Sequence, residues 1–437
     1  MNTDINTWTR VKLEQIAKCQ GGSAFSPALQ GKKTGAIPFF KVSDMNLPEN
    51  RWFMKASNNY VDETDVSSII GAAKPECAVV FPKVGAAVHT NKKRMLTRRS
   101  FIDNNVMAVW STDPTRCRPG FLYLYFLSIN LSDLSNPGPL PSINNSKVYE
   151  REVLLPSPEE QDRMFAAIMV LQNALEVEEK AIVAARELKQ SALDRFFTSG
   201  LRSRGSGSAE VDSVPPTWVA ESLDECCRVV SSSMTYTQLS AYAEPSSSNA
   251  DVAGVMGIKV SDMNLPGNEI EIRSANLQRT MPIVEARRRS VPPHVVVFPK
   301  RGAAIATNKK RMTSAWTVLD PNLIAVEAGE GIDPKFLYQW FQRFDLRSIT
   351  EPGPTPQLNK KNLLPLLVPH PRELAEQREI AGALEGIDTA IASHEKKRSV
   401  LSELLFSMLH GLMTGEIRVD NCDIDISEVA NAQLCPR

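Results

Sequence analysis

A chain of 437 residues, with 42% hydrophobic and 23% charged residues, has an ordinary globular composition and enough length for roughly two to four domains. No stretch approaches the roughly 18 consecutive apolar residues of a membrane span, and the first ten residues lack the cationic and apolar regions of a signal peptide, so we expect a cytoplasmic protein without membrane contact. The 50 basic and 50 acidic residues balance, which argues against an acidic partner such as DNA unless basic residues are segregated locally.

The first 155 residues predict a compact domain of mixed α and β structure. Short apolar runs such as CAVVFP from Cys77 and VMAVW from Val106 lie between proline, glycine and asparagine turns, a pattern typical of short buried strands. FLYLYFLS from Phe121 follows Arg-Pro-Gly and indicates one short helix. We assign residues 1–155 to this domain.

Residues 156–201 are predicted to form one long helix. Pro156 and Pro158 suit a helix start, and Gly200 lies near the expected end. From Met164 the apolar residues repeat at spacings of four and three, which is the pattern of a coiled-coil seam. A helix of this length would extend roughly 60 Å.

The second half repeats this order after a polar, glycine- and serine-containing segment, residues 202–215, which predicts a flexible linker. Residues 216–370 again combine short apolar strands with one short helix, and residues 371–415 predict a second long helix with its own apolar seam. Residues 416–437 form a C-terminal tail. The predicted fold class is therefore mixed α and β (α+β), with two tandem globular domains, each followed by a long helix.

The two halves are copies of one another. KVSDMNLP occurs at residues 41–48 and again at 259–266, and FPKVGAAVHTNKKRM at 81–95 returns as FPKRGAAIATNKKRM at 298–312 with 12 of 15 residues unchanged. NPGPLPSIN from Asn136 likewise matches EPGPTPQLN in the second half. Solenoid repeats run to only about 20–50 residues, so this much longer period indicates a duplicated domain.

Basic residues gather within the repeated segments, so the neutral total conceals two basic patches. TNKKRM offers cations for phosphates and amides for base edges, the two kinds of group that DNA recognition needs. Its asparagine could pair with adenine, its lysines with phosphates and its arginine with phosphate or guanine. The candidate DNA-binding residues of the first domain are Ser43, Asp44, Asn46, Lys83, Asn91, Lys92, Lys93 and Arg94. Those of the second domain are Ser261, Asp262, Asn264, Lys300, Arg301, Asn308, Lys309, Lys310 and Arg311.

Each of these motifs also has a structural interpretation. A Lys-Lys-Arg run is often a solvated hairpin tip, and shared ancestry can preserve a merely structural turn in both copies. Ser-Asp and Asn-Leu-Pro are natural turn formers, so the pattern slightly favours a structural role for KVSDMNLP over a role in reading bases.

These motifs, in this order and duplicated with the helices, resemble the specificity subunit of type I restriction-modification systems over nearly the whole chain. The family's "IPF-K-SDM" segment is similar to IPFFKVSDM from Ile37 and to MGIKVSDM from Met256. Its "VVFPK-G" segment is similar to the runs from Val79 and Val296, and its boundary before each helix is similar to LLPSPEEQ and LLVPHPRELAEQ.

The resemblance implies two target-recognition domains whose helices pack as an antiparallel coiled coil that serves as a spacer. It also implies a subunit that reads a bipartite double-stranded DNA sequence on behalf of two DNA adenine methyltransferase subunits, with restriction and translocase subunits able to join. S-adenosylmethionine, ATP and Mg are then expected only in those partners, with no cofactor in this chain. The second copy departs from the pattern by having Gly257 where Pro38 and Phe39 would align, so that strand is expected to start differently.

We find no catalytic motif and expect a non-catalytic chain without a metal site. NPGP at Asn136 is not the Asn/Asp-Pro-Pro-aromatic motif of an amino-methyltransferase, and GKKTG at Gly31 lacks the full phosphate-loop pattern. Neither the five histidines nor the seven cysteines show metal-ligand spacing. The alternative from another class is a coiled-coil scaffold whose basic loops join protein partners without sequence-specific DNA readout, and such a scaffold would show no preferred DNA motif.

Overall fold

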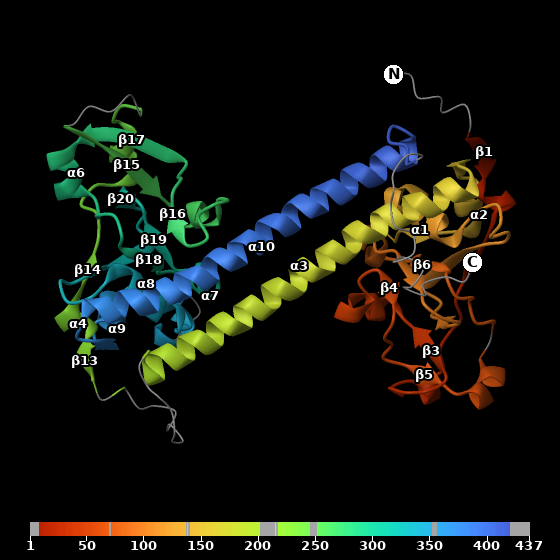
Figure 1. Ribbon diagram of the computed structural model, residues 1–437, viewed down its shortest axis with the longest axis horizontal. Coiled ribbons are helices and arrows are strands. Elements are labelled where there is room, and N and C mark those ends of the chain that lie inside the picture. Colours follow the sequence, from red (N-terminus) through yellow and green to blue (C-terminus); the bar gives the residue numbers. More distant parts are fainter. Residues whose placement is uncertain are drawn as a thin grey trace. The chain divides into compact units, whose positions relative to one another are not determined.

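The computed structural model divides the chain into two units, described here one at a time. The first unit comprises residues 1–179 and 396–437, and the second comprises residues 180–395, so each holds one globular domain and part of both long helices (Figure 1). The described residues are 8–69, 71–136, 138, 140–201, 215, 217–244, 251–351 and 356–419. The linker expected at 202–215 and the tail expected at 416–437 lie largely outside them.

A five-stranded sheet lies at the centre of the first domain. Its order is β2 (Ala17–Gly21), β9 (Val106–Ser111), β6 (Val79–Pro82), β7 (Arg94–Leu96) and β4 (Phe53–Met54). The predicted strands CAVVFP and VMAVW are confirmed as β6 and β9. Val79 and Phe81 of β6 join the core beneath α1 (Pro119–Ser128), whereas Val80 joins a second core with Met45. Burial on both faces explains why β6 reads as a continuous apolar run.

Smaller elements complete the first domain. A three-stranded sheet has the order β5 (Tyr60–Val61), β3 (Ile37–Phe40) and β8 (Phe101–Ile102). Its core stacks Phe39 on Phe25, with ring centroids 3.7 Å apart. The other elements are the pair β1 (Thr9–Lys12) and β12 (Glu152–Leu155), the pair β10 (Ser135–Asn136) and β11 (Ser142–Ile143), and α2 (Asn145–Tyr149).

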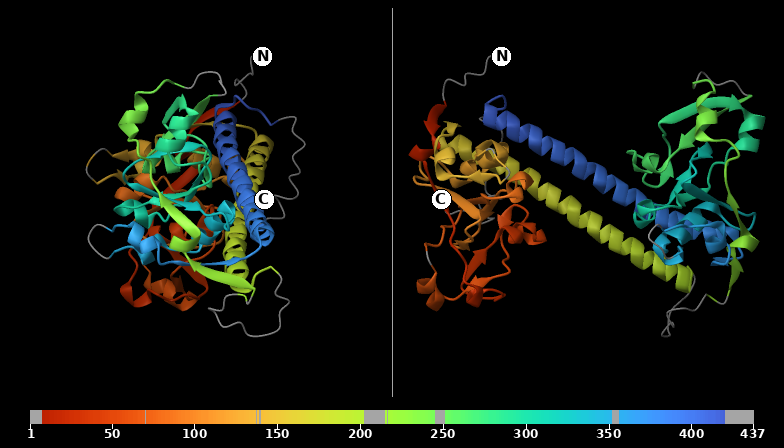
Figure 2. Two further views of the ribbon diagram at one scale, coloured as in Figure 1. Left: turned by 90° about the vertical axis from the view of Figure 1, so that its left-hand side faces the viewer. Right: turned by 180° about the vertical axis from the view of Figure 1, so that it is seen from behind.

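The second domain repeats both sheets with the same topology. Its five-stranded sheet has the order β14 (Cys227–Val230), β21 (Leu323–Ala328), β18 (Val296–Pro299), β19 (Arg311–Thr313) and β16 (Glu271–Ile272). Its three-stranded sheet has the order β17 (Leu277–Pro282), β15 (Val252–Ile258) and β20 (Trp316–Leu319). The remaining strands β13 (Trp218–Ser222) and β22 (Leu367–Pro371) pair with each other on the side away from the three-stranded sheet (Figure 2).

The second domain differs from the first in its three-stranded sheet. Strand β15 has seven residues where β3 has four, which confirms that the strand containing Gly257 starts differently. The short helices of this unit are α4 (Leu223–Cys226), α5 (Tyr236–Ser240), α6 (Ile283–Arg289), α7 (Ala303–Ala306), α8 (Pro334–Gln342) and α9 (Lys360–Leu363). Helix α8 occupies the place that α1 has in the first domain and confirms the predicted short helix.

The long helices α3 (Pro158–Ser199) and α10 (Leu374–Thr414) pack antiparallel within each unit. In the first unit, Leu409 and Leu412 near the end of α10 share a core with Met164 and Ile168 near the start of α3. In the second unit the end of α3 meets the start of α10 in a core that includes Leu193, Phe197, Ile380 and Leu384. The antiparallel pairing is thereby confirmed in each unit. None of the described helices is long and apolar enough to cross a lipid bilayer.

Candidate nucleic-acid interface

The KVSDMNLP and TNKKRM motifs contact one another in both units. In the first unit the Lys92 ammonium donates to Oδ1 of Asn46, and in the second Lys309 donates to Oδ1 of Asn264. Lysine and asparagine side chains from segments more than 40 residues apart thus lie at one surface. The same arrangement arises twice because each NKKRM turn leads into a strand of the five-stranded sheet, β7 or β19, beside the KVSDMNLP turn.

The third repeated motif, NPGPLPSIN from Asn136 and EPGPTPQLN from Glu351, is joined to the start of the FPK-G segment by backbone hydrogen bonds. Lys83 follows strand β6, and its carbonyl accepts from the amide of Ile143 at 2.8 Å. The next turn has Gly85 at φ 74°, a left-handed conformation that favours glycine, and its amide donates to Pro141. The second unit repeats both bonds at Lys300 and Gly302. Pro137 and Pro139 of the first copy of this motif lie outside the described residues.

The carboxylates of Asp44 and Asp262, which were predicted to read bases, form hydrogen bonds inside their own domains. Asp44 lies in the 3-10 helix Val42–Asn46 and is fully buried. Its carboxylate accepts from the Lys41 amide at 2.7 Å and from the amide and side chain of Asn58 at 3.1 and 2.7 Å. Asp262 has the equivalent partners in the second unit. With these bonds a buried carboxylate cannot reach a base edge, which corrects the DNA-contact prediction for this pair.

The neighbouring residues of the same 3-10 helices remain at the surface. Ser43 and Asn46 are exposed in the first unit, and Ser261 and Asn264 are exposed in the second. Their contact with DNA stays a prediction. Because Asp44 and Asp262 hold the backbone of each turn, the turn presents these exposed groups in a fixed orientation.

The asparagine of TNKKRM has a structural role in both units. Asn91 has φ 55° and Asn308 has φ 52°, the left-handed conformation that asparagine tolerates better than most residues. Oδ1 of Asn91 accepts from the Leu131 amide at 2.9 Å, and Oδ1 of Asn308 accepts from the Leu346 amide at 2.9 Å. Bidentate pairing with adenine needs that oxygen, so the predicted adenine contact is not available in this conformation.

The second lysine of the motif is buried. Lys93 is 2% exposed and Lys310 is 1% exposed. The Lys93 ammonium donates to the Ile129 carbonyl at 2.6 Å, and the Lys310 ammonium donates to Phe344 and to Asn308. Burial lowers the pKa of each lysine to about 8. These two lysines hold a neighbouring loop, which corrects their assignment as phosphate contacts.

The buried lysines predict a pH effect on stability. Between pH 8 and 10.5 the unfolded chain keeps protons that folded Lys93 and Lys310 have released, so each contributes stability that rises with pH. The buried thiols of Cys19 and Cys117, whose pKa is raised by burial, act in the opposite direction, so wild type must be compared with Lys93→Met. Urea denaturation gives the free energy of unfolding of both proteins. Between pH 8 and pH 9.5, the value for wild type minus the value for Lys93→Met should rise by about 1–2 kcal/mol. An unchanged difference would contradict the burial of a charged lysine.

The arginine of the motif is half-buried in both units. Arg94 Nε donates to the Asn50 carbonyl at 2.5 Å, and its Nη1 donates to the Lys93 carbonyl at 2.8 Å. Arg311 makes the equivalent bond to the Lys310 carbonyl at 2.8 Å. Burial lowers the pKa of both guanidinium groups. Each arginine therefore braces the turn, and its contact with phosphate or guanine stays a prediction.

Sequence reasoning missed one fully buried asparagine in each unit. The Asn50 side chain donates to the carbonyls of Asp44 and Ala56 at 2.8 and 2.6 Å and accepts from the amides of Lys55 and Ala56. Asn268 makes the same four bonds in the second unit. The available signal was the second residue after each KVSDMNLP, which is asparagine in both copies of a stretch that otherwise differs.

Sequence reasoning also missed the first lysine of KVSDMNLP. The Lys41 ammonium lies 5.5 Å from the centroid of the Phe25 ring, and the Lys259 ammonium lies 4.1 Å from that of Tyr236. Both lysines thus hold a cation over an aromatic ring that comes from a part of the chain where the two copies differ. Among the lysines and arginines of the candidate set, Lys83, Lys92, Lys300, Arg301 and Lys309 are likewise not buried.

The described residues contain no group of three or more histidine, cysteine or acidic side chains that could hold a metal ion. Each unit instead presents hydrogen-bond donors, amides and cations on the surface formed by KVSDMNLP and TNKKRM. Such groups bind phosphates and base edges.

Known proteins share part of this sequence and its fold. Residues 5–185 match the model of the type I restriction modification DNA specificity domain. The fold is similar to the type I restriction-modification S subunit from M. genitalium, with a TM-score of 0.60 and 14% identity over 94% of this chain and 97% of that one. The HsdS subunit from Thermoanaerobacter tengcongensis has a TM-score of 0.41 and 16% identity over 94% of this chain and 97% of that one.

Proposed function

We propose that this chain is a specificity subunit of a type I restriction-modification system and that each of its units reads one half of a bipartite DNA target. The observation that carries this proposal is the repetition of one surface. Both units bring a lysine and an asparagine from separate repeated motifs into contact, and both keep further cations accessible beside them. Phosphate contacts from the shared residues would orient each domain on the duplex.

The parts that differ between the units are proposed to read different half-sites. Strands β3 and β15 differ in length, and α6 of the second unit carries exposed Arg287 and Arg288 in its last turn. Base edges are read by a few side chains in precise positions, so surfaces that differ in this way select different bases. The target should accordingly have two unlike halves rather than a palindrome.

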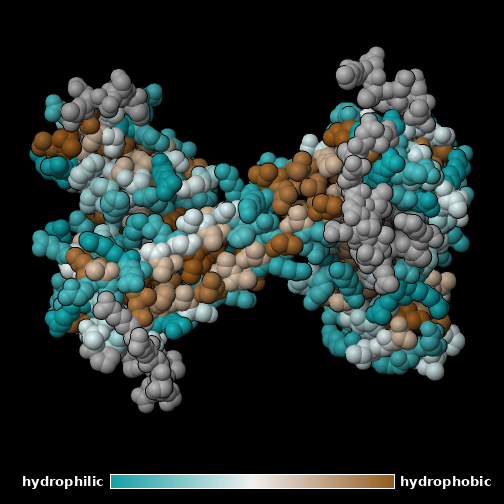
Figure 3. Space-filling model, viewed as in Figure 1, coloured by the Kyte–Doolittle hydropathy of each residue, from teal (hydrophilic) through white to brown (hydrophobic). Residues whose placement is uncertain are grey.

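The chain is proposed to act without chemistry of its own in the cytoplasm. Two DNA adenine methyltransferase subunits and the restriction and translocase subunits would supply methylation and cleavage, and S-adenosylmethionine, ATP and Mg would bind in them. Apolar side chains on the exposed face of the long helices support docking of such partners (Figure 3). Those exposed in the first unit include Val170, Val177, Val400, Leu404 and Phe406.

Methylome sequencing tests the proposal directly. A host that expresses this chain with the methyltransferase encoded beside it should modify adenines in one split motif with two unlike half-sites. The purified chain alone should transfer no methyl group. Methylated adenines without a common motif would favour the scaffold alternative, and methyl transfer by the chain alone would refute the division of labour.

The accessible lysines predict a change in salt dependence. Replacing Lys92 and Lys309 together with alanine should lower the slope of log affinity against log salt by about 1.8, because each lost phosphate contact removes about 0.9. Lys147→Ala, on α2 and 50% exposed at its side chain, is the matched control and should leave the slope unchanged. Fluorescence anisotropy on target DNA across a salt series measures both. An unchanged slope in the double variant would make this turn a solvated loop.

A further inference from the structure

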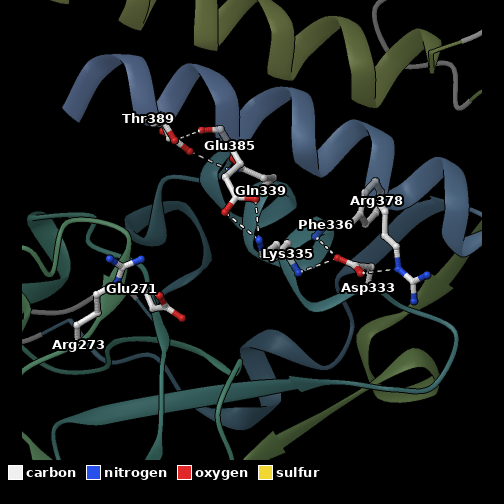
Figure 4. A network of polar contacts seen from close by, with 10 residues as sticks. Glu271, Arg273, Asp333, Lys335, Phe336, Gln339, Arg378, Glu385 and Thr389 are labelled. Atoms are coloured by element: carbon white, nitrogen blue, oxygen red, sulfur yellow. Dashed lines mark hydrogen bonds and ion pairs between the residues drawn. The ribbon is translucent and has the colours of Figure 1, made fainter. Parts of the chain in front are cut away.

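The second unit contains an open cavity of about 560 Å³ between the segment around strand β16 of its domain and the two helices α8 and α10. This volume falls within the roughly 300–1,000 Å³ of ordinary ligand sites. Figure 4 shows Glu271 of β16 and the nearby Arg273 on one side, and Lys335, Gln339 and Glu385 on the helix side. The lining also includes Glu269, Ile270, His294, Tyr338, Ala381 and Thr389.

The corresponding place in the first unit can be located from backbone hydrogen bonds. The Met95 amide donates to the Trp52 carbonyl, and the Met312 amide donates to the Ile270 carbonyl. Trp52 and Ile270 are therefore equivalent, and Phe53 is equivalent to Glu271.

The helices are matched in the same way. Gln161 of α3 accepts from the Arg118 amide at 2.7 Å, and Gln377 of α10 accepts from the Asp333 amide at 2.8 Å. Counting four residues onward from each glutamine makes Phe165 equivalent to Ala381.

Aromatic side chains occupy this place in the first unit. Phe165 packs directly on α1 at Gly120, where a Cβ atom would lie only 2.6 Å from the ring. Phe53 is buried and has its ring 6.0 Å from that of Tyr123. In the second unit Trp52, Phe53 and Phe165 are replaced by isoleucine, glutamate and alanine, and Lys335 takes the place of Gly120. The cavity is thus the space that aromatic rings fill in the other copy of the fold.

A basic side chain at this place in the first unit is replaced by an acidic one beside the cavity of the second unit. In the first unit the Arg51 guanidinium lies 5.2 Å from the Trp52 ring centroid. The equivalent residue in the second unit is Glu269, which is exposed and forms no ion pair with any described residue. Glu271 and Glu385 are paired with Arg273 and Lys335 respectively. Glu269 accepts from the Gly267 amide and is near enough to raise the pKa of Arg311 against the lowering by burial, but among the described carboxylates that line the cavity it is the one without an ion pair.

One buried polar atom points to the same occupant. Gln339 lines the cavity and is 3% exposed. Its Nε2 donates to Asp388 at 3.0 Å, but its Oε1 has no hydrogen-bond partner among the described residues. Because this oxygen is itself buried, an indole N–H in the cavity would supply the missing donor after a small rotation of the Gln339 side chain.

We propose that this cavity is a docking site for a protein segment that inserts an aromatic side chain, with tryptophan preferred, next to a basic residue. The aromatic ring would occupy the space that Phe165, Phe53 and Trp52 occupy in the first unit, and the basic residue would pair with Glu269. Because the first unit fills this place with its own side chains, one chain binds one such segment. The site therefore distinguishes the two halves of a protein whose sequence is otherwise duplicated.

The test uses the full chain and the dipeptide acetyl-Arg-Trp-amide, with acetyl-Arg-Ala-amide and acetyl-Glu-Trp-amide as controls. Ligand-observed NMR titration should show saturation transfer to the indole protons and a preference of about tenfold or more for Arg-Trp over either control. The filled variant carries Ala381→Phe with Lys335→Gly, which copies the Phe165 and Gly120 pair of the first unit. It should lose binding of the dipeptide about tenfold or more while keeping its DNA affinity.

Glu269→Arg is the second variant and changes only an exposed side chain. It should abolish the preference for Arg-Trp over Glu-Trp even if the filled variant does not fold. Equal binding of the tryptophan and alanine dipeptides to wild type would overturn the proposal, as would unchanged binding by a filled variant that is folded. DNA binding is measured on the same samples, so loss of specific DNA recognition would be seen separately and would concern the proposed function instead.

Discussion

Replacing Lys189 with methionine is expected to lower the free energy of unfolding of the second unit by about 3–5 kcal/mol. The Lys189 ammonium lies 2.5 Å from Oδ1 of Asp388, and the two side chains are only 16% and 8% exposed. Gln339 donates to the other carboxylate oxygen at 3.0 Å. Without Lys189 the carboxylate stays buried with one neutral donor, and an unpaired buried charge is far more costly than the loss of an exposed ion pair.

The first unit supplies the control for this prediction. Its residues equivalent to Asp388 and Lys189 are Gln172 and Leu405, which form no ion pair. The double variant Lys189→Leu with Asp388→Gln copies them and should recover most of the lost stability. Urea denaturation of wild type, both single variants and the double variant gives the coupling energy. A single variant within about 1 kcal/mol of wild type would show that the pair is too well hydrated to matter.

Replacing Arg418 with alanine is expected to destabilise the first unit by a similar amount, about 3–5 kcal/mol. Arg418 follows α10 and forms two hydrogen bonds to the Glu160 carboxylate, at 2.6 and 3.2 Å. Its guanidinium also lies 5.6 Å from the Trp8 ring centroid, and the indole nitrogen of Trp8 donates to the same carboxylate at 3.0 Å. Only 5% of the Glu160 side chain is exposed, so the arginine is its main compensation.

Hydrogen exchange measures this effect where it should occur. Amides of β1 and of the first turns of α3 should exchange faster in Arg418→Ala, whereas those of the second unit should be unchanged. Arg418→Lys keeps the charge but cannot form both bonds of the planar guanidinium, so it should fall between wild type and the alanine variant. Equal exchange in all three proteins would mean that the residues after α10 do not hold the first unit together.

The sequence predicted the elements whose cause is local. The long helices were expected at 156–201 and 371–415 and lie at Pro158–Ser199 and Leu374–Thr414, because prolines and glycines delimit an apolar repeat of period three and four. The buried strands β6 and β9 were recognisable for a similar reason, since their apolar runs are short and end in turn residues.

The roles of the candidate site residues were less predictable because distant segments decide them. The buried Lys93 donates to the carbonyl of Ile129, which lies 36 residues further along the chain, and the buried Asp44 accepts from Asn58, 14 residues further along. A lysine in a Lys-Lys-Arg run has no local feature that distinguishes a buried ammonium from an exposed one. The repetition of the motif in both halves was therefore evidence of a shared structure, and it could not separate the bracing residues from the exposed Asn46 and the accessible Lys92.

The division into units has a consequence for how the protein is made. The second unit is one continuous stretch of chain, whereas the core of the first unit includes Leu409, Leu412 and Val419 from the far end. During translation the ribosome must add about 240 residues after Glu179 before that core is complete, which takes roughly 12–48 s at about 5–20 residues per second. Throughout this time Met164 and Ile168 lack their partners on α10. We expect chaperones that bind exposed apolar segments to hold the nascent first unit, and the second unit to fold before it.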